Sequence, residues 1–204
     1  MTKASAFDRF LAAAAEVGVS VDAVRYPDGT RTAADAAAAV GCEVSQIVKS
    51  LVVIGPEGAA LALTAGHHRV DLALLGDVMG GPVEMSDARA AREATGFSIG
   101  GTPPFGHPAP LTTFLDPSLL EHEVVYAAAG TPDSCFPISP GELQALPKGT
   151  EPFGHVLEVD VKGKDLFVEL QRLRGVPLLF LGTAHEIIDS YQLVFDLIIH
   201  SERP

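Results

Sequence analysis

The chain has 204 residues and a mass of 21.3 kDa, and 47% of its residues are hydrophobic, which suits one domain with a packed core. This composition excludes a disordered protein, and no stretch reaches the roughly 20 consecutive apolar residues of a membrane span. The net charge of −12 excludes broad electrostatic attachment to nucleic acid. No secretory signal is predicted at the N-terminus, and the two cysteines, Cys42 and Cys135, lie outside any CxxC motif. We therefore expect a soluble, cytoplasmic protein with free thiols.

The N-terminal part of the chain is predicted to form two helices around a short strand. These elements are expected over residues 6–17, 22–26 and 32–40. Both helices have start signals, because Ser5 precedes the first, and Thr32 with Asp35 gives the second a capping-box pattern. Gly41 is expected to end the second helix.

The middle of the chain predicts a hairpin followed by alternating helices and strands. The expected elements are strands at 46–54 and 59–64, helices at 70–79 and 86–95, a strand at 111–115, a helical turn from Pro117, strands at 123–128 and 136–138, and a helix at 140–146. A four-residue loop, 55–58, is expected to join the first two strands. Residues 97–110 are dense in glycine and proline and predict irregular structure.

The composition changes at Pro147, where a linker-like stretch begins. We therefore predict two units, residues 1–147 and a C-terminal extension, 148–204. The extension is expected to be a small β-α-β-α unit, with elements at 156–161, 165–172, 176–181 and 186–199.

Lys49 is the most unusual residue of the predicted hairpin. It is the only lysine between Lys3 and Lys148, and alternation places it on an apolar face of its strand with Ile47 and Leu51. A lysine in that place must reach solvent, find an anion or lose its charge. It is either a functional residue or a lysine that covers apolar surface at a sheet edge.

Two stretches of small residues could approach a ligand closely. The first, residues 95–107, contains Gly100 and Gly101, and its bare backbone N–H groups suit a phosphate, a carboxylate or a carbonyl. It lacks the patterns of nucleotide-binding loops, so a tight connection between a helix and a strand is the alternative. The second, residues 127–132, contains Gly130 and follows a predicted strand.

A polar cluster at residues 66–71 lies between a predicted strand and a predicted helix. Its adjacent histidines, His67 and His68, point in different directions, and the other histidines show no metal-binding spacing, so no metal site is predicted. Asp71 also suits the N-terminus of the helix that follows. No GxSxG elbow appears, and the two cysteines are expected to be small apolar residues rather than nucleophiles.

Taken in order, four segments resemble the YbaK/prolyl-tRNA synthetase-associated editing domain family, the free-standing aminoacyl-tRNA deacylases. The matching segments are 48–52, 65–71, 95–107 and 128–131, and the resemblance covers about residues 5–147. It implies an α/β fold around a mixed, barrel-like sheet with helices packed outside. The chain departs from the family at His67 and His68, where many relatives carry an acidic residue, which leaves the accepted amino acid open.

The resemblance implies hydrolysis of the ester that joins a wrong amino acid to the 3′-terminal adenosine of a tRNA, with no cofactor, metal or covalent nucleophile. Lys49 would be the catalytic residue, holding the phosphate or ribose end and orienting the ester. The residues implied to bind the substrate are Ser50, Gly66, His67, Gly100, Gly101, Thr102, Pro103 and Gly130. Ile47, Leu51 and the turn at 103–105 suggest a compact pocket for alanine, serine, threonine or cysteine.

Two other hypotheses stay open: a non-catalytic module that binds an amino acid or a nucleotide, and a structural or regulatory partner. The helix expected at 186–199 has a broad apolar stripe, which must cover either the editing domain or a second copy of the chain in a homodimer. The basic residues of the extension either contact the tRNA acceptor stem or are ordinary solvated charges.

Overall fold

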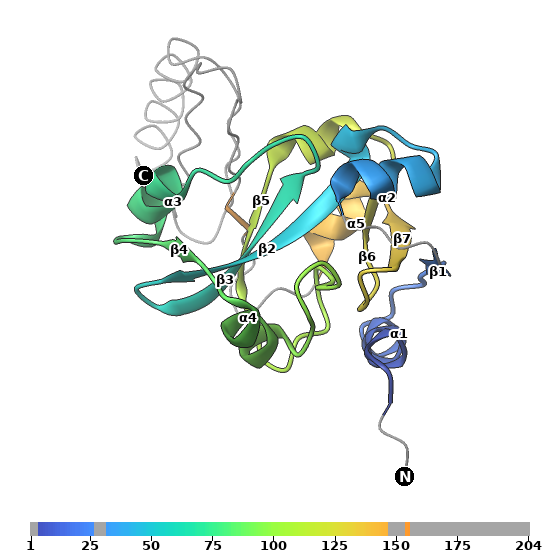
Figure 1. Ribbon diagram of the computed structural model, residues 1–204, viewed down its shortest axis with the longest axis horizontal. Helices are drawn as coiled ribbons and strands as arrows, with labels where there is room; N and C mark the ends of the chain where they lie inside the picture. The colour runs from blue at the N-terminus through green and yellow to red at the C-terminus, as the bar shows by residue number, and fades with distance from the viewer. Residues whose placement is uncertain (1–3, 27–31, 147–153, 156–204) are drawn as a thin grey trace, which may run out of the picture.

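A computed structural model describes residues 4–26, 32–146 and 154–155 of the protein (Figure 1). Its strands are β1 (Val24–Arg25), β2 (Ile47–Gly55), β3 (Gly58–Ala65), β4 (Glu84–Met85), β5 (Thr112–Leu115), β6 (Val125–Ala128), β7 (Ser134–Ile138) and β8 (Gly154–His155). Its α-helices are α1 (Ala6–Glu16), α2 (Ala33–Val40), α3 (Leu72–Met79), α4 (Ala88–Thr95) and α5 (Pro140–Ala145), and its 3₁₀ helices are η1 (Val44–Gln46) and η2 (Pro117–Glu121).

The strands form one mixed sheet in the order β1-β7-β6-β2-β3-β5-β8, and β4 pairs with β2 off this path. The predicted α/β fold with a mixed sheet and surrounding helices is confirmed. In the described part of the chain the sheet is open, with β1 and β8 at its two ends, rather than closed into a barrel.

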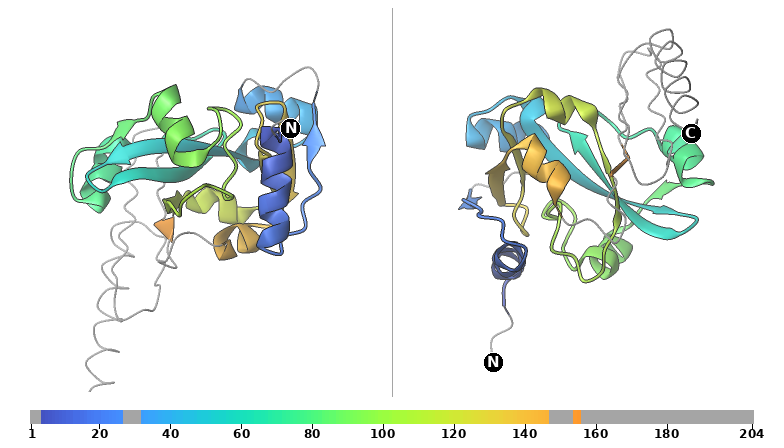
Figure 2. Two further views of the ribbon diagram at one scale, coloured as in Figure 1. Left: turned by 90° about the horizontal axis from the view of Figure 1, so that it is seen from below. Right: turned by 180° about the vertical axis from the view of Figure 1, so that it is seen from behind.

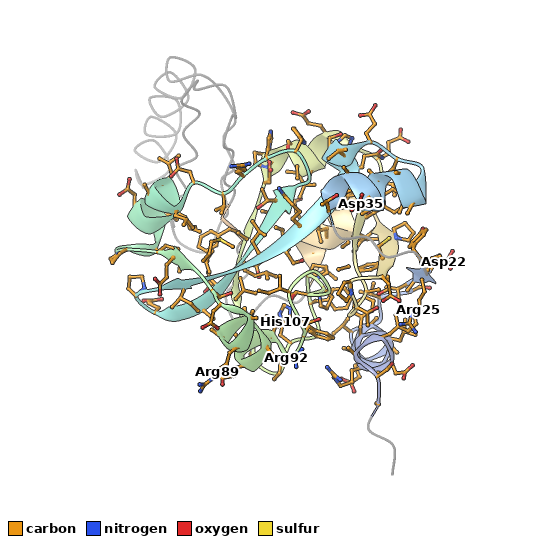
Figure 3. All side chains as sticks on the ribbon, viewed as in Figure 1. Asp22, Arg25, Asp35, Arg89, Arg92 and His107 are labelled. Carbon is orange, nitrogen blue, oxygen red and sulfur yellow. The ribbon has the colours of Figure 1, made fainter. Side chains whose placement is uncertain are left out.

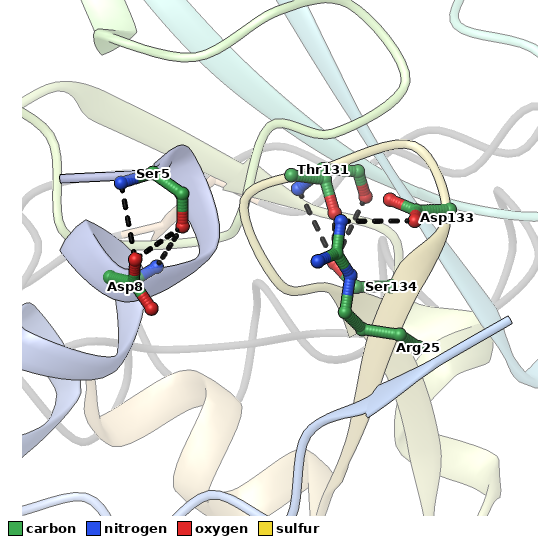
Figure 4. A network of polar contacts seen from close by, with 6 residues as sticks. All are labelled: Ser5, Asp8, Arg25, Thr131, Asp133 and Ser134. Carbon is green, nitrogen blue, oxygen red and sulfur yellow. Dashed lines mark hydrogen bonds and ion pairs between the residues drawn. The ribbon is translucent and has the colours of Figure 1, made fainter. Parts of the chain in front are cut away.

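Helix starts follow the side chains that cap them. The Ser5 hydroxyl accepts a hydrogen bond from the Asp8 backbone N–H at 3.1 Å, and the Asp8 carboxylate accepts one from the Ser5 N–H at 3.2 Å (Figure 4). Thr32 caps α2 in the same way, as predicted, and Gly41 ends that helix. The helices α3 and α4 begin two residues later than predicted, because aspartates rather than the preceding residues cap them.

The β2–β3 hairpin is tighter than expected. Gly55 pairs with Gly58, so the loop has two residues, Pro56 and Glu57, and the predicted four-residue loop is wrong. Gly58 makes this possible because its φ of 108° lies in a region that side chains rarely adopt. The two glycines therefore extend the ladder instead of forming the loop.

Strand β2 lies inside the sheet. It pairs with β3 along its length, and its other edge pairs with β6 at Ile47 and Val48 and with β4 at Val53 and Ile54. Lys49 therefore lies on an interior strand of the sheet rather than on an end strand. No ladder pair among the described residues occupies the second edge of β2 from residue 49 to 51.

Two hydrophobic clusters lie on opposite faces of the hairpin. The larger includes Val48 and Val52 together with Ala91 of α4, and the smaller includes Val53 together with Leu75 of α3. The two helices accordingly lie on opposite sides of the hairpin (Figure 2). Alternation along β2 then places the Lys49 side chain on the α3 side.

The elements predicted over 156–199 lie outside the described residues, and the division of the chain at residue 147 stays a prediction. One observation bears on it: β8 pairs in parallel with β5, through Thr113 with Gly154 and Phe114 with His155. The last strand of the sheet is thus contributed from beyond the predicted boundary.

Candidate functional site

Lys49 lies where β2, β3 and the loop after β3 meet. Its cross-strand partner is Thr64, and its ammonium group donates a hydrogen bond to the backbone carbonyl of His68. The side chain is half-buried. Burial lowers the pKa of Lys49, and nearby Arg69 lowers it further while Asp116 acts in the opposite direction. The charge of Lys49 is therefore costly where it stands, which is typical of a functional lysine and less so of a structural one.

A buried carboxylate organises the same loop. Asp116, whose side chain is 1% exposed, accepts hydrogen bonds at Oδ2 from the Ala65 N–H at 2.9 Å and from His68 Nδ1 at 2.8 Å. At Oδ1 it accepts from the backbone N–H of Ser118 at 3.0 Å and from the Ser118 hydroxyl at 2.7 Å. Asp116 thereby ties the end of β3 to the start of η2 and holds the loop whose carbonyl receives Lys49.

Basic side chains gather around Lys49 in an otherwise acidic chain. Burial, followed by the neighbouring His68, lowers the pKa of His67, and Lys49 and His122 are close enough to lower it further. The rings of His67 and His68 are 3.9 Å apart. The exposed Arg69 completes this group of Lys49, Arg69, His67, His68 and His122, which we call the cationic cluster after its two cations, Lys49 and Arg69.

Gly66 is required for packing. A Cβ atom on Gly66 would lie 2.2 Å from the carbonyl oxygen of Val44 and 3.1 Å from the Cβ of Ala33. Any side chain at this position would push the end of β3 away from η1 and α2. Gly66 therefore fixes the loop that carries His67 and His68.

The glycine-rich loop packs on the turn between β6 and β7. A Cβ on Gly101 would lie 2.7 Å from the Thr131 Cα, and a Cβ on Gly130 would lie 2.6 Å from the Ala6 carbonyl oxygen. Gly130 also has a φ of 95°, and Gly100 one of 82°. Backbone thus approaches backbone closely here, which only glycine permits.

Hydrogen bonds fix the shape of this loop from within. The Thr102 hydroxyl donates to the Ser98 carbonyl at 3.2 Å, and His107 Nε2 lies 3.0 Å from the Pro103 carbonyl oxygen. His107 lies beside the loop, near α4 (Figure 3).

The turn against which the loop packs is also held by polar contacts (Figure 4). The Ser134 hydroxyl lies 2.8 Å from that of Thr131 and donates to the Thr131 carbonyl at 3.1 Å. Arg25 of β1 binds Asp133 at 3.1 Å. The glycine-rich loop therefore rests on a rigid turn.

The predicted site residues form two groups. Lys49, Gly66 and His67 lie together at the end of β3, and Gly100, Gly101 and Gly130 lie together at the β6–β7 turn. No hydrogen bond in the described chain joins the two groups. The parallel pairing of β2 with β6 brings the two groups near each other. Val48 pairs with Ala127, so the end of β6, which leads to Gly130, lies beside Lys49.

Ser50 faces the opposite side of β2 from Lys49. Its hydroxyl is the one buried side-chain polar atom in the described part of the chain that has no hydrogen-bond partner. Such an atom is costly to bury unless a ligand or a water satisfies it.

Three residues of the network around Asp116 were not among the predicted site residues: Asp116, Ser118 and His68, which the sequence singled out only as the neighbour of His67. Asp116 stands directly before Pro117 and has the signature of a helix cap, which it also is. Its partner His68 is 48 residues away in the sequence, and no local pattern relates two positions so far apart.

In the described residues, no group of three His, Cys, Asp or Glu side chains is arranged to hold a metal ion. Among the same residues there is also no helix long and apolar enough to cross a membrane.

The fold is a mixed sheet with a half-buried lysine on an interior strand and a glycine-rich loop packed beside it. Residues 27–146 match the aminoacyl-tRNA editing domain family. Because this match covers more than half of the chain, the protein belongs to that family.

Relatives and solved structures agree with this assignment. The chain is 30% identical over 123 residues to the uncharacterized protein YwhH of Bacillus subtilis (strain 168), covering 60% of this chain and 78% of YwhH. It is 44% identical, with a TM-score of 0.68, to a crystal structure described as a candidate trans-editing enzyme for prolyl tRNA synthetase, covering 71% of this chain and 93% of that one. A scaffold protein used for epitope backbone grafting is 41% identical, with a TM-score of 0.70, over 76% of this chain and 97% of the scaffold.

Proposed function

We propose that this protein hydrolyses mischarged aminoacyl-tRNA in trans, cleaving the ester between a wrong amino acid and the 3′-terminal adenosine. The observation that carries the proposal is Lys49, a half-buried lysine inside the sheet, at the centre of a cationic cluster in a member of an editing family. The alternative is a module of the same fold that binds an amino acid or a nucleotide without catalysis.

The cationic cluster resolves the conflict between an acidic chain and a polyanionic partner. A net charge of −12 disfavours a broad contact with tRNA, but the acceptor end presents only a few phosphates. Lys49 would bind the phosphate or ribose of the terminal nucleotide and thereby orient the ester, and His67 and Gly66 would line this side. The acceptor end of a tRNA is the partner that suits such a local site.

The glycines would act on the other end of the ester. Gly100 is exposed, whereas Gly101 and Gly130 are buried and the Gly101 N–H donates to the Ser98 carbonyl at 3.0 Å. We propose that the exposed backbone at Gly100 contacts the ester carbonyl and the α-amine, and that Gly101 and Gly130 hold it in place. Thr102, Pro103 and Ser50 would shape the amino-acid pocket. Because Ser50 faces the opposite side of β2 from Lys49, its buried, unpartnered hydroxyl would meet such a ligand at the edge of β2, residues 49–51, that has no ladder partner among the described residues.

An aminoacyl ester is already activated, so this chemistry needs no metal and no covalent nucleophile. Positioning the ester and stabilising the developing oxyanion with preorganised donors supply much of the acceleration. We therefore propose a cofactor-free carboxylic ester hydrolase in which water is the nucleophile.

We propose small substrates: alanine, serine, threonine or cysteine on the wrong tRNA. Ile47 and Leu51 flank Lys49, and the loop at Pro103 is closely packed. An apolar pocket discriminates by only about 1–3 kcal/mol per methylene, so some cross-reactivity is expected. The structure that is 44% identical makes tRNA for proline the first tRNA to test.

The experiment is a deacylation assay of the full chain on a panel of tRNAs charged with correct and incorrect amino acids. We expect release of a small amino acid from a mischarged tRNA and little action on correctly charged tRNA. A folded protein that deacylates nothing but binds an amino acid or a nucleotide would establish the non-catalytic module instead. A preference for a large aromatic amino acid would contradict the compact pocket.

A further inference from the structure

His68 and Asp116 form a carboxylate–imidazole pair beside Lys49. A carboxylate only accepts hydrogen bonds, so His68 Nδ1, 2.8 Å from Asp116 Oδ2, must carry the proton of that bond. The same carboxylate is fixed by three further hydrogen bonds, one from Ala65 and two from Ser118. The imidazole is therefore held in one orientation and one tautomer.

This tautomer leaves Nε2 as a free lone pair. No hydrogen bond in the described part of the chain involves Nε2 of His68. Nε2 is also absent from the buried, unpartnered side-chain atoms there, which comprise only the Ser50 hydroxyl, so it reaches the solvent-accessible surface. His68 as a whole is buried, with 8% of the surface of the residue exposed. In the neutral imidazole, Nδ1–H points to Asp116 and Nε2 is an exposed acceptor, which is the geometry that a general base requires.

The position of the pair connects it to the proposed site. The backbone carbonyl of His68 accepts a hydrogen bond from the Lys49 ammonium, and the ring of the same residue binds Asp116. The imidazole therefore belongs to a residue that directly contacts the lysine proposed to hold the substrate. The cross-strand and loop contacts that place Lys49 therefore also place the imidazole.

We propose that His68 is the general base of the deacylation and that Asp116 is its positioning residue. This inference rests on the proposed function, since it assigns a proton acceptor to that reaction. Ser118 supports the pair by satisfying the second oxygen of Asp116.

In the proposed step, Nε2 takes a proton from water as the water oxygen bonds to the ester carbonyl carbon. The tetrahedral adduct then collapses, the bond between the carbonyl carbon and the ribose oxygen breaks, and the imidazolium returns its proton to that oxygen. The products are the tRNA with a free hydroxyl and the amino acid, whose carboxylic acid loses its proton to solvent. No oxidant, metal or other reactant is required.

The surroundings of His68 define how the step depends on pH. Its Nδ1 lies 2.8 Å from Asp116 Oδ2 and 3.4 Å from the Ser118 hydroxyl, and its ring centroid is 3.9 Å from that of His67. Lys49 and His122 are in turn close to His67, and Arg69 is close to Lys49. The base must be unprotonated, so the rate should fall as the solution is acidified. Because the imidazoles of His67 and His122 lie nearby, the fall must be assigned with variants.

The test is single-turnover deacylation by the full chain against pH, on the mischarged tRNA that the wild type deacylates fastest. We expect His68→Gln to reduce the rate constant about 100-fold or more and to remove the acid limb, with little change in tRNA affinity. His67→Gln and His122→Gln should keep the acid limb. Imidazole added to His68→Ala should restore part of the rate and should not do so for Lys49→Ala.

Asp116→Asn tests the positioning role, because an amide presents a donor where the carboxylate accepts. We expect it to reduce the rate constant and displace the acid limb, with a smaller loss than His68→Gln. The control Asp87→Asn changes an aspartate that caps α4 outside the site, and it should do neither.

Thermal unfolding of each variant separates folding from catalysis. If the wild type is active and His68→Gln keeps both its rate and its acid limb, this inference is overturned and the proposed function stands. If His68→Ala folds, loses activity and gains nothing from imidazole, the histidine is structural and the inference is overturned. If the wild type deacylates no tRNA, both proposals fall.

Discussion

A half-buried lysine inside a sheet costs stability, so its presence at position 49 calls for a compensating role. The side chain contributes charge rather than packing. In the described chain its ammonium group makes one hydrogen bond, to the His68 carbonyl. We predict that Lys49→Ala lowers the deacylation rate about 100-fold or more while leaving the fold intact. Lys49→Arg should rescue poorly, because a planar guanidinium does not replace a compact ammonium.

The measurement is kcat/KM for the deacylation, with circular dichroism to check the fold. Arg89→Ala is the matched control, because Arg89 points away from the sheet, has a side chain that is 84% exposed, and pairs with no described residue other than Glu93 (Figure 3). A surface ion pair of this kind contributes at most about 1 kcal/mol, so the control should keep the wild-type rate. Near-full activity of the alanine variant would mean that Lys49 is not catalytic.

Cys135 predicts a pH dependence of stability. Burial raises the pKa of its thiol to about 11, above the ordinary value of 9.0. Between these values the folded chain keeps the proton that the unfolded chain releases, so stability that is fully present below pH 9.0 is lost as the pH rises towards 11. The loss is at most about 3 kcal/mol.

Because burial also raises the pKa of Tyr26, the total alkaline loss has more than one source. Urea unfolding of the wild type and of Cys135→Ala, followed from pH 8 to 11, isolates the share of Cys135 (roughly the range in which the thiol titrates). We expect the free energies of unfolding of the two proteins to converge as the pH rises. Parallel curves would show that the thiol is not shielded.

At the scale of the elements, the glycines of the proposed pocket have a defined steric role. A Cβ on Gly101 would lie 2.7 Å from the Thr131 Cα, a contact that real structures do not show. We predict that Gly101→Ala separates the glycine-rich loop from the β6–β7 turn, lowering both the melting temperature and the deacylation rate.

Gly141 provides the control, since it lies in α5 and a Cβ there meets nothing within 4 Å. Gly141→Ala should raise stability by about 0.5–1 kcal/mol, because alanine favours a helix more than glycine does, and leave the rate unchanged. Differential scanning calorimetry and the deacylation assay measure both effects. Equal behaviour of the two variants would refute the steric role of Gly101.

Local signals in the sequence were enough to predict most of these elements. Ser5 and Thr32 cap α1 and α2 as expected, and the hairpin was predicted from alternation and its glycines. The two-residue strand β4 was missed, because Glu84 and Met85 are too few to show a period. Strand order, and with it the interior place of Lys49, depends on pairings between distant segments that no local pattern encodes.

The candidate site, too, could be predicted from the sequence only where a residue is unusual in its local surroundings. Lys49 stood out because a charge in an apolar strand is anomalous by itself, and the family resemblance supplied a role for it. Asp116 did not stand out, because its cap signature explains it without reference to His68. A buried pair that joins two loops becomes visible only when the chain is folded.

At the scale of the whole molecule, the contribution of the C-terminal extension, residues 148–204, is a prediction that truncated chains can test. The cores of the editing domain lie within residues 10–146, yet β8 extends its sheet from residues 154–155. We therefore expect a chain ending at Leu146 to fold with lower stability than one ending at His155, because Thr113 and Phe114 of β5 lose their ladder partners. Urea unfolding of both chains measures the difference, and equal stability would show that β8 contributes nothing.

The chain ending at His155 also tests what the extension does. Its predicted apolar helix at 186–199 lies outside the described residues and needs a surface to cover, so we expect the full chain to be a homodimer and the shortened chain a monomer. The basic residues of the extension are expected to be solvated charges, because we propose that the cationic cluster around Lys49 binds the acceptor end. The slope of tRNA affinity against salt concentration should therefore be the same for both chains, since it counts the phosphates that the protein neutralises. Sedimentation and filter binding give the two answers separately: a full-length monomer would refute the dimer, and a shallower slope after truncation would assign phosphate contacts to the extension.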